Sequence, residues 1–107
     1  MARAVDDASF SREVLDSELP VLVDFWAEWC PPCLAMDPIV DALSGELEGK
    51  VKIVKLDVAS NPDTVVRYNV RAMPTMIIFK QGEPADMRVG SGQSRVQLVK
   101  WLEAYAS

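Results

Sequence analysis

Residues 20–27 form an almost unbroken apolar run with β-branched and aromatic side chains, and this run constrains the fold more than any other feature. A strand with such a pattern is covered on both faces, because an exposed face shows polar residues at every second position. The run therefore predicts a central strand in a sheet with helices on both sides. One polar residue, Asp24, interrupts it.

The segments around this strand alternate between strand and helix patterns. Before the central strand we expect a short edge strand at 3–6 and a helix at about 8–17. After it we expect a helix at about 32–47 that is kinked at Pro38, a strand at 51–58 and a short helix at about 62–68. The chain then ends with a hairpin, with strands at 75–80 and about 85–89, and a last helix that begins with a capping box of Ser94 and Gln97. We expect Asp7 and Asn61 to cap the first and third of these helices. Strands joined through helices imply right-handed parallel crossovers, so the predicted class is α/β with a mixed sheet.

Length and charge limit the classes of protein that this chain can represent. Its 107 residues suffice for one core, so we expect a single domain over residues 1–107. The net charge of -5 and the lack of a basic cluster argue against a nucleic-acid groove. The absence of histidine removes Cys-His and Ser-His-Asp nucleophiles and the commonest zinc ligand. No apolar stretch resembles a signal peptide or a membrane span, and we expect a cytoplasmic protein unless an export signal has been trimmed away.

The only two cysteines, Cys30 and Cys33, directly follow the central strand. A bridge between them closes such a short loop that the chain-entropy formula values it at roughly 2 kcal/mol, well below the gain from a long loop. The pair is therefore better suited to thiol-disulfide exchange than to stabilising the fold. Cys30 lies where a strand meets a helix, so the helix N-terminus stabilises its thiolate and Cys33 is the expected resolving thiol. A static disulfide, half of a metal or iron-sulfur site shared with a second chain, and two unreactive thiols are the other interpretations.

Asp24 is a lone carboxyl group in an apolar strand, and burial there is expected to raise its pKa. We predict that it accepts the proton of Cys33 while the mixed disulfide is resolved, through water. Alternatively, Asp24 faces solvent at a strand end or pairs structurally with Lys55. If the strand at 51–58 is a neighbour, Lys55 modulates this carboxyl group; otherwise it is a surface lysine.

Two further features lie near the cysteines or just before a later strand. Met73-Pro74 precedes the strand at 75–80, where a cis bond can form a tight turn, although the sequence leaves the isomer open. Trp26 and Trp29 flank the start of the cysteine motif. We expect Trp26 in the core and Trp29 on a contact surface for protein substrates.

These residues belong to a longer ordered set of short motifs that extends over essentially the whole chain. The set is Val23-Asp24-Phe25-Trp26-Ala27, Trp29-Cys30 with Pro32-Cys33, Pro38, Lys55-Leu56-Asp57, Asn61-Pro62, Val70-Arg71, Met73-Pro74-Thr75, Phe79-Lys80, Gly82-Glu83 and Val89-Gly90. In this set the sequence closely resembles the thioredoxin family.

The resemblance implies the thioredoxin fold, with about five strands and about four helices, and a cis bond before Pro74. It also implies specific roles for residues of the site. Cys30 is the implied nucleophile, Cys33 the resolver, and Asp24 the buried carboxyl group beside Lys55. The implied peptide-binding surface consists of Trp29, Ala72, Met73, Pro74 and Gly90.

Pro31 is the main departure from the family, which usually has Gly at this position. Pro31 offers no N–H to the Cys30 thiolate and fixes the backbone between the sulfurs, and both effects predict a more reducing couple. We therefore regard Pro31 and Pro32 as redox-tuning residues. Leu34 stands where a basic residue is frequent, which alters docking to a reductase, and Ala72 stands where Gly is frequent.

The sequence thus predicts a protein-disulfide reductase that works through Cys30 and Cys33. The expected partners are a thioredoxin reductase and disulfide-containing protein substrates, with no nucleic acid and no membrane, and we expect a monomer. We expect no metal and no cofactor beyond the redox-active disulfide. The alternatives are an oxidase or isomerase of an exported compartment, a non-catalytic binding module, and an iron-sulfur scaffold built by two chains.

Overall fold

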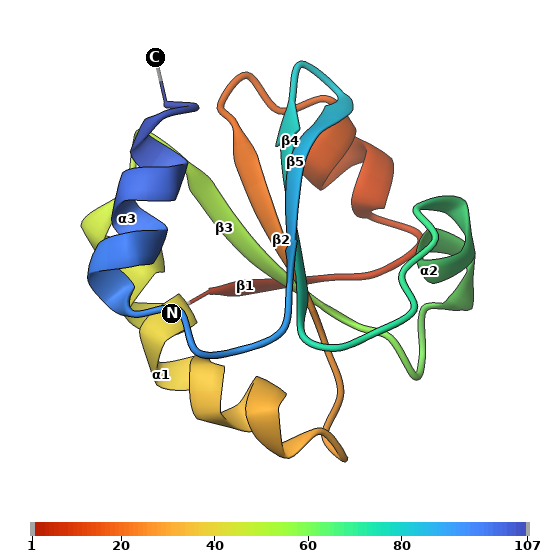
Figure 1. The fold of residues 1–107 in the computed structure, drawn as a ribbon. Coiled ribbons are helices and arrows are strands. Elements are labelled where there is room, and N and C mark those ends of the chain that lie inside the picture. The colour runs from red at the N-terminus through yellow and green to blue at the C-terminus, as the bar shows by residue number, and fades with distance from the viewer. Residues whose placement is uncertain (1, 107) are drawn as a thin grey trace.

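The computed structural model describes residues 2–106, and the centre of this part of the chain is one mixed sheet (Figure 1). Its strands are β1 (Arg3–Val5), β2 (Val21–Trp26), β3 (Lys52–Asp57), β4 (Thr75–Lys80) and β5 (Glu83–Val89). Their order across the sheet is β1-β3-β2-β4-β5. The first three pair in parallel, whereas β4 is antiparallel to both β2 and β5. The predicted α/β class with a mixed five-stranded sheet is confirmed.

Helices cover both faces of this sheet (Figure 1). They are the short π-helix η1 (Ser11–Leu15), α1 (Pro31–Glu46), α2 (Pro62–Arg67) and α3 (Arg95–Glu103). On one face, Val40 of α1 and Leu98 of α3 belong to the same apolar cluster as Leu22 of β2. The second cluster joins Val14 of η1 to the other face of the sheet. Within residues 2–106, no helix is long and apolar enough to cross a membrane.

Strand β2 is the central strand that the apolar run at 20–27 predicts. It lies between β3 and β4, and residues 21–25 are all buried. Successive side chains of a strand point to opposite faces, so Asp24 shares a face with Leu22. Since Leu22 packs in the cluster that contains α1 and α3, Asp24 points toward the side that α1 covers.

The first helix begins later and is shorter than the predicted helix at 8–17. It is η1, in which the N–H of Asp16 donates to the carbonyl oxygen of Ser11 at 2.9 Å. Just before it, Ser9 N–H donates to Asp6 Oδ1 at 2.8 Å and Asp6 N–H donates to Ser9 Oγ at 3.0 Å. These local side-chain bonds compete with helical hydrogen bonds, so the helix starts only after this turn.

Asp7 caps α2 rather than the first helix, which corrects two sequence predictions. Its carboxylate accepts hydrogen bonds from the N–H groups of Asp63 at 3.2 Å and Thr64 at 3.0 Å, and from the Thr64 hydroxyl at 2.6 Å. Asn61 occupies the N-cap position, but its side chain bonds to the backbone of Asp7 and Asp57 instead. Although burial opposes the change, the bonds from Thr64 and Asp63 hold the pKa of Asp7 below its ordinary value.

The hairpin of β4 and β5 is confirmed, with a tighter turn than the sequence indicates. Strand β5 starts at Glu83 and includes Pro84, so only Gln81 and Gly82 connect the strands. Both have positive φ, 54° and 80°, as two-residue hairpin turns require. A Cβ at Gly82 would lie 3.1 Å from the carbonyl oxygen of Leu15, so the turn packs closely on η1. Pro84 is tolerated because β5 is an edge strand next to a register shift.

The last helix, α3, has the predicted capping box. Ser94 Oγ accepts from the N–H of Gln97 at 3.1 Å, and Gln97 Oε1 accepts from the N–H of Ser94 at 2.8 Å. Its far end is tied to β5 because Asp86 Oδ2 accepts hydrogen bonds from Trp101 Nε1 at 2.8 Å and from the Tyr105 hydroxyl at 2.7 Å. These bonds fix α3 across the edge of the sheet.

Candidate active site

Cys30 and Cys33 form a disulfide at the junction between β2 and α1. Cys30 is the N-cap residue of α1, and its Sγ accepts a hydrogen bond from the N–H of Cys33 at 3.2 Å. The N-terminus of a helix stabilises negative charge through its free N–H groups and its dipole. Neither Pro31 nor Pro32 has an N–H to add, so the Cys33 N–H is the backbone donor that this loop offers to the sulfur. The geometry therefore favours a thiolate on Cys30.

Both cysteines are largely covered, with 5% of Cys30 and 2% of Cys33 exposed. They form a small apolar cluster with Ala27, and Met73 packs against it. The Met73–Pro74 peptide bond is cis, as the resemblance implies. Met73 therefore lies beside the cysteine pair, next to the cis bond.

Gly90 lies beside Pro74 at the end of β5. Its N–H donates to the carbonyl oxygen of Pro74 at 2.8 Å, and its φ of +96° is one that residues with a side chain rarely adopt. Ala72, which precedes Met73, is exposed. The segment 72–74 is thus bonded at Pro74 to Gly90, the residue that follows β5, and touches the cysteine cluster through Met73.

The two tryptophans of the motif have different environments. Trp29 precedes Cys30 and is 66% exposed. Trp26, expected in the core, is instead half-buried and packs against the cysteine cluster. Trp26 is the last residue of β2 and the one residue of that strand that is not fully buried.

Asp24 is buried, as predicted, and only 1% of it is exposed. Its Oδ1 has no hydrogen-bond partner among residues 2–106. Burial raises the pKa of Asp24 to about 7, with an opposing effect from the Lys55 ammonium and a smaller raising effect from the Asp37 carboxylate. The alternative that Asp24 faces solvent is wrong.

Lys55 faces Asp24 in the register of β2 and β3, as the sequence anticipated for neighbouring strands. Its ion pair, however, is with Asp37 of α1, and its Nζ lies 4.6 Å from the centre of the Trp26 ring. Its side chain is only 14% exposed, so it is not a surface lysine. The alternative of a structural pair between Asp24 and Lys55 is also wrong.

Asp37 is the residue of this site that sequence reasoning missed. It lies one helical turn after Cys33, in a helix whose other acidic residues point elsewhere, such as Glu46, which pairs with Arg95. The one signal in the sequence that could have pointed to Asp37 is its spacing of four residues from Cys33, which places both residues on the same face of the helix. The sequence alone does not connect it to Lys55.

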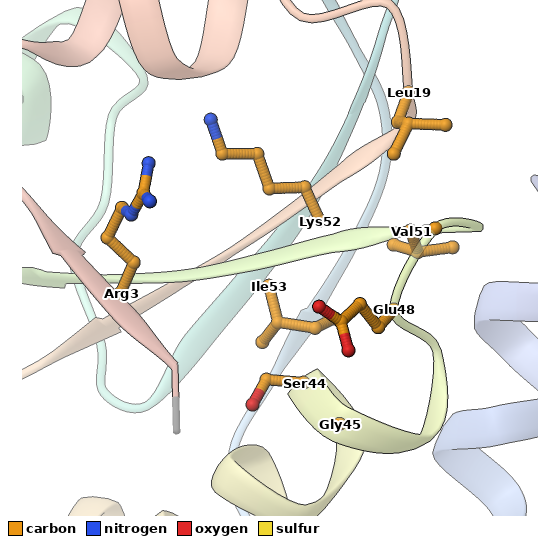
Figure 2. A pocket seen from close by; sticks show the side chains of 9 residues that line it. Arg3, Leu19, Ser44, Gly45, Glu48, Val51, Lys52 and Ile53 are labelled. Atoms are coloured by element: carbon orange, nitrogen blue, oxygen red, sulfur yellow. The ribbon is translucent and has the colours of Figure 1, made fainter.

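A cavity of about 340 Å³ lies apart from this site, at the other end of the sheet (Figure 2). It is lined by Arg3, Leu19, Ser44, Gly45, Glu48, Gly49, Val51, Lys52 and Ile53. These residues gather around the amino ends of β2 and β3, whereas Cys30 follows the carboxyl end of β2. The two cations that line it, Arg3 and Lys52, both pair with Glu13, at 2.9 and 3.0 Å.

Comparisons with known proteins agree with the fold and the cysteine pair. The family model described as Thioredoxin matches residues 2–104. The chain is 50% identical to the thioredoxin of Rickettsia conorii over 102 residues, which are 95% of this chain and 96% of that protein. It is 54% identical to the thioredoxin of Synechocystis sp. over 101 residues, 94% of each chain. It is also 54% identical to thioredoxin C-2 of Corynebacterium nephridii over 85 residues, 79% of each chain. The chain therefore belongs to the thioredoxin family and is a thiol-disulfide oxidoreductase that reduces protein disulfides.

Proposed function

We propose that Cys30 is the attacking thiol of this reductase and Cys33 the resolving thiol. The observation that supports this assignment is the place of Cys30 at the N-cap of α1, with the Cys33 N–H directed at its sulfur. A thiolate is the reactive form of cysteine, and a helix N-terminus lowers the cost of its negative charge. Cys33 lies inside the first turn of the same helix and is more deeply covered.

The reaction then proceeds in two exchange steps. The Cys30 thiolate attacks one sulfur of a substrate disulfide, so that a mixed disulfide forms and the first substrate thiolate leaves. Cys33 loses its proton and attacks Cys30 Sγ, which forms the Cys30–Cys33 disulfide and releases the second substrate thiolate. The protein loses two electrons and the substrate gains them, so the exchange itself needs no further group. The structure corresponds to the oxidised product.

Asp24 is the proposed acceptor of the Cys33 proton. It points to the side of the sheet that α1 covers, and its pKa of about 7 suits a group that takes up and releases protons near neutral pH. Lys55 acts on this carboxyl group as a neighbouring positive charge from β3. Water between Asp24 and Cys33 completes the transfer.

The proposed substrate surface consists of Trp29, Ala72, Met73, Pro74 and Gly90. Its support is the exposed ring of Trp29, which precedes Cys30 in the chain, and the packing of Met73 against the cysteines. An exposed aromatic side chain and an adjoining apolar segment can cover an extended peptide at low conformational cost.

The proposed partners are disulfide-containing proteins and a thioredoxin reductase that restores the dithiol. We also propose that the protein works as a monomer and that no cofactor is bound. The cytoplasmic location expected from the sequence stays a prediction. An oxidase or isomerase role differs from this proposal in the direction of electron flow, which the equilibrium potential against a glutathione buffer measures.

Reduction of insulin disulfides tests the assignment, with a thioredoxin reductase and its nicotinamide donor supplying electrons. We expect Cys30→Ser to reduce turnover to the background rate. Cys33→Ser should instead accumulate a mixed disulfide with the substrate, visible by mass spectrometry. The roles would be reversed if Cys30→Ser trapped the substrate and Cys33→Ser did not. A wild-type protein that stays silent with its dithiol intact would favour a binding module.

A further inference from the structure

Lys55 has two carboxyl groups within reach and forms its ion pair with only one of them. Asp24 faces it directly across β2 and β3, yet its ammonium pairs with Asp37 on α1. The ring of Trp26 lies 4.6 Å from the same ammonium and supports this orientation from the β2 side. The Lys55 ammonium therefore has two contacts, the Asp37 carboxylate on α1 and the Trp26 ring on β2.

The exposure of the two carboxyl groups explains this preference. Asp37 keeps 35% of its side chain in contact with water, whereas Asp24 is 1% exposed and has an Oδ1 with no hydrogen-bond partner among the described residues. Ionising Asp24 requires a fully desolvated negative charge, which is costly without a partner. A lysine already engaged by a solvated carboxylate compensates that charge less than a lysine in direct contact.

The charged groups that act on Asp24 come from two elements. Strand β3 contributes Lys55, and α1 contributes Asp37. On the other side, the register partner in β4 is Met76, which carries no titratable group. The buried carboxyl group is thus influenced by one cation, Lys55, and one anion, Asp37, whose effects on its pKa are opposite.

We propose that Asp37 is a positioning residue, which holds the Lys55 ammonium away from Asp24 and so keeps the Asp24 carboxyl group able to exchange a proton near neutral pH. This inference rests on the proposed role of Asp24 as proton acceptor of Cys33. Asp37 does not touch the reacting sulfurs in this scheme; it acts through Lys55. It also repels the Asp24 anion directly, an effect of the same sign.

Removal of the Asp37 charge has a definite expected consequence. In Asp37→Asn, the ammonium of Lys55 loses its anionic partner and turns to the carboxyl group that it faces across the strands. An opposite charge in contact favours the ionised form of a carboxyl group. Asp24 should then release its proton at a lower pH and no longer match the pH range in which Cys33 must be deprotonated.

The direct test is the carboxyl carbon titration of Asp24, followed by nuclear magnetic resonance in the oxidised full-length protein. We expect the midpoint in Asp37→Asn to fall by about one pH unit, a tenfold change in proton affinity. Asp37→Glu retains the charge and should stay near the wild-type midpoint. Glu46→Gln is the matched control, because it removes one negative charge and an ion pair with Arg95 from the far end of the same helix. An Asp24 midpoint that is unchanged or higher in Asp37→Asn would overturn the inference.

A second pair of variants separates positioning from simple repulsion. In a Lys55→Gln background there is no ammonium to redirect, so Asp37→Asn should move the Asp24 midpoint by less than half of its effect in the wild type. An undiminished effect in that background would show that Asp37 acts only through its own charge, which contradicts the positioning role. Because Asp37 is partly solvated on a helix surface, Asp37→Ala serves as a second variant if Asp37→Asn misfolds.

The kinetic arm distinguishes a failure of this inference from a failure of the proposed function. The rate at which Cys33 resolves a mixed disulfide is measured against pH in the wild type, Asp37→Asn and Asp24→Asn. We expect the pH midpoint of this rate in Asp37→Asn to shift with the Asp24 titration. If Asp24→Asn keeps the wild-type pH profile, the proton-acceptor role of Asp24 is wrong, whereas the titration still decides what Asp37 does to Asp24.

Discussion

Asp24 and Lys55 occupy facing positions on β2 and β3, but Lys55 forms its ion pair with Asp37 across the interface between β3 and α1. The central strand of the sheet therefore carries a carboxyl group that is buried without a direct ionic partner. This arrangement affects both the proposed proton transfer and the stability of the fold.

The buried carboxyl group of Asp24 makes stability depend on pH. Its pKa is 3.8 when unperturbed and about 7 in the folded state, so the folded state binds this proton more tightly. The stabilisation of the folded state by the bound proton of Asp24 is then fully present below about pH 4 and is lost as the pH rises toward 7. We expect the stability advantage of Asp24→Asn over wild type to be about 3 kcal/mol larger at pH 8 than at pH 4.

Urea unfolding of the oxidised protein at both pH values measures this difference. Glu46→Gln provides the control, because its exposed ion pair should contribute less than about 1 kcal/mol at either pH. A stability difference between Asp24→Asn and wild type that is the same at pH 4 and pH 8 would contradict the prediction.

Asp7 should stabilise the fold through its cap on α2, and Asp7→Ala is expected to lower the free energy of unfolding by about 1–2 kcal/mol. The carboxylate bonds to Asp63 and Thr64, so its loss leaves two N–H groups of α2 without this partner. Because the pKa of Asp7 is lowered, its contribution is present above pH 3.8 and lost as the pH falls below that value. Asp6→Ala, which removes only a local bond to Ser9, is the control in urea unfolding at pH 7. Equal losses in the two variants would rule out a special role for Asp7.

Pro31 should make the dithiol a stronger reductant than a glycine at this position would. Pro31→Gly restores an N–H beside the Cys30 thiolate and loosens the backbone between the sulfurs, and both changes favour the reduced form. We expect the potential to rise by about 30 mV, which corresponds to a tenfold change in the exchange equilibrium. Equilibration against a glutathione buffer measures it, with Ala35→Gly as a control that loosens the same helix outside the cysteine loop. An unchanged or lower potential in Pro31→Gly would refute this effect.

Trp29 should contribute to substrate docking and little to the stability of the fold, because the residue is 66% exposed. We expect Trp29→Ala to raise the KM for insulin about fivefold, equivalent to about 1 kcal/mol of contact energy, with kcat nearly unchanged. Val96→Ala removes an exposed apolar side chain from α3 and should leave KM as it is. A KM for Trp29→Ala that equals the wild-type value would exclude Trp29 from the docking surface.

Predictions that depend on local patterns agree well with the structure. The apolar run around Asp24 is a central strand, Ser94 and Gln97 form their capping box, and the cysteines lie where β2 passes into α1. Each of these features depends on residues that are close together in the chain, such as the successive apolar residues of one strand or the two residues of a capping box, which lie three positions apart. Their physical causes are therefore readable without knowledge of the fold.

The failures concern polar side chains that had more than one available partner. Asp7 was a plausible cap for the helix after it, but it caps α2 because β1 places the following turn beside Asn61. Lys55 faces Asp24 across β2 and β3 as the sequence predicts, but the sequence does not predict the ion pair that Lys55 forms with Asp37 of α1. Local propensity favours a polar side chain at a helix start or strand position but does not choose among distant partners.

The sequence by itself determined the order of the strands and helices along the chain and the place of the redox pair, because periodicity, capping and cysteine spacing act over a few residues. Only the tertiary structure decided which charges meet. The bond of Asp7 to the Thr64 hydroxyl spans 57 positions and that of Lys55 to Asp37 spans 18. Such contacts exist only after the helices pack on the sheet, where burial leaves Asp24 desolvated and assigns Lys55 to a solvated carboxylate on α1.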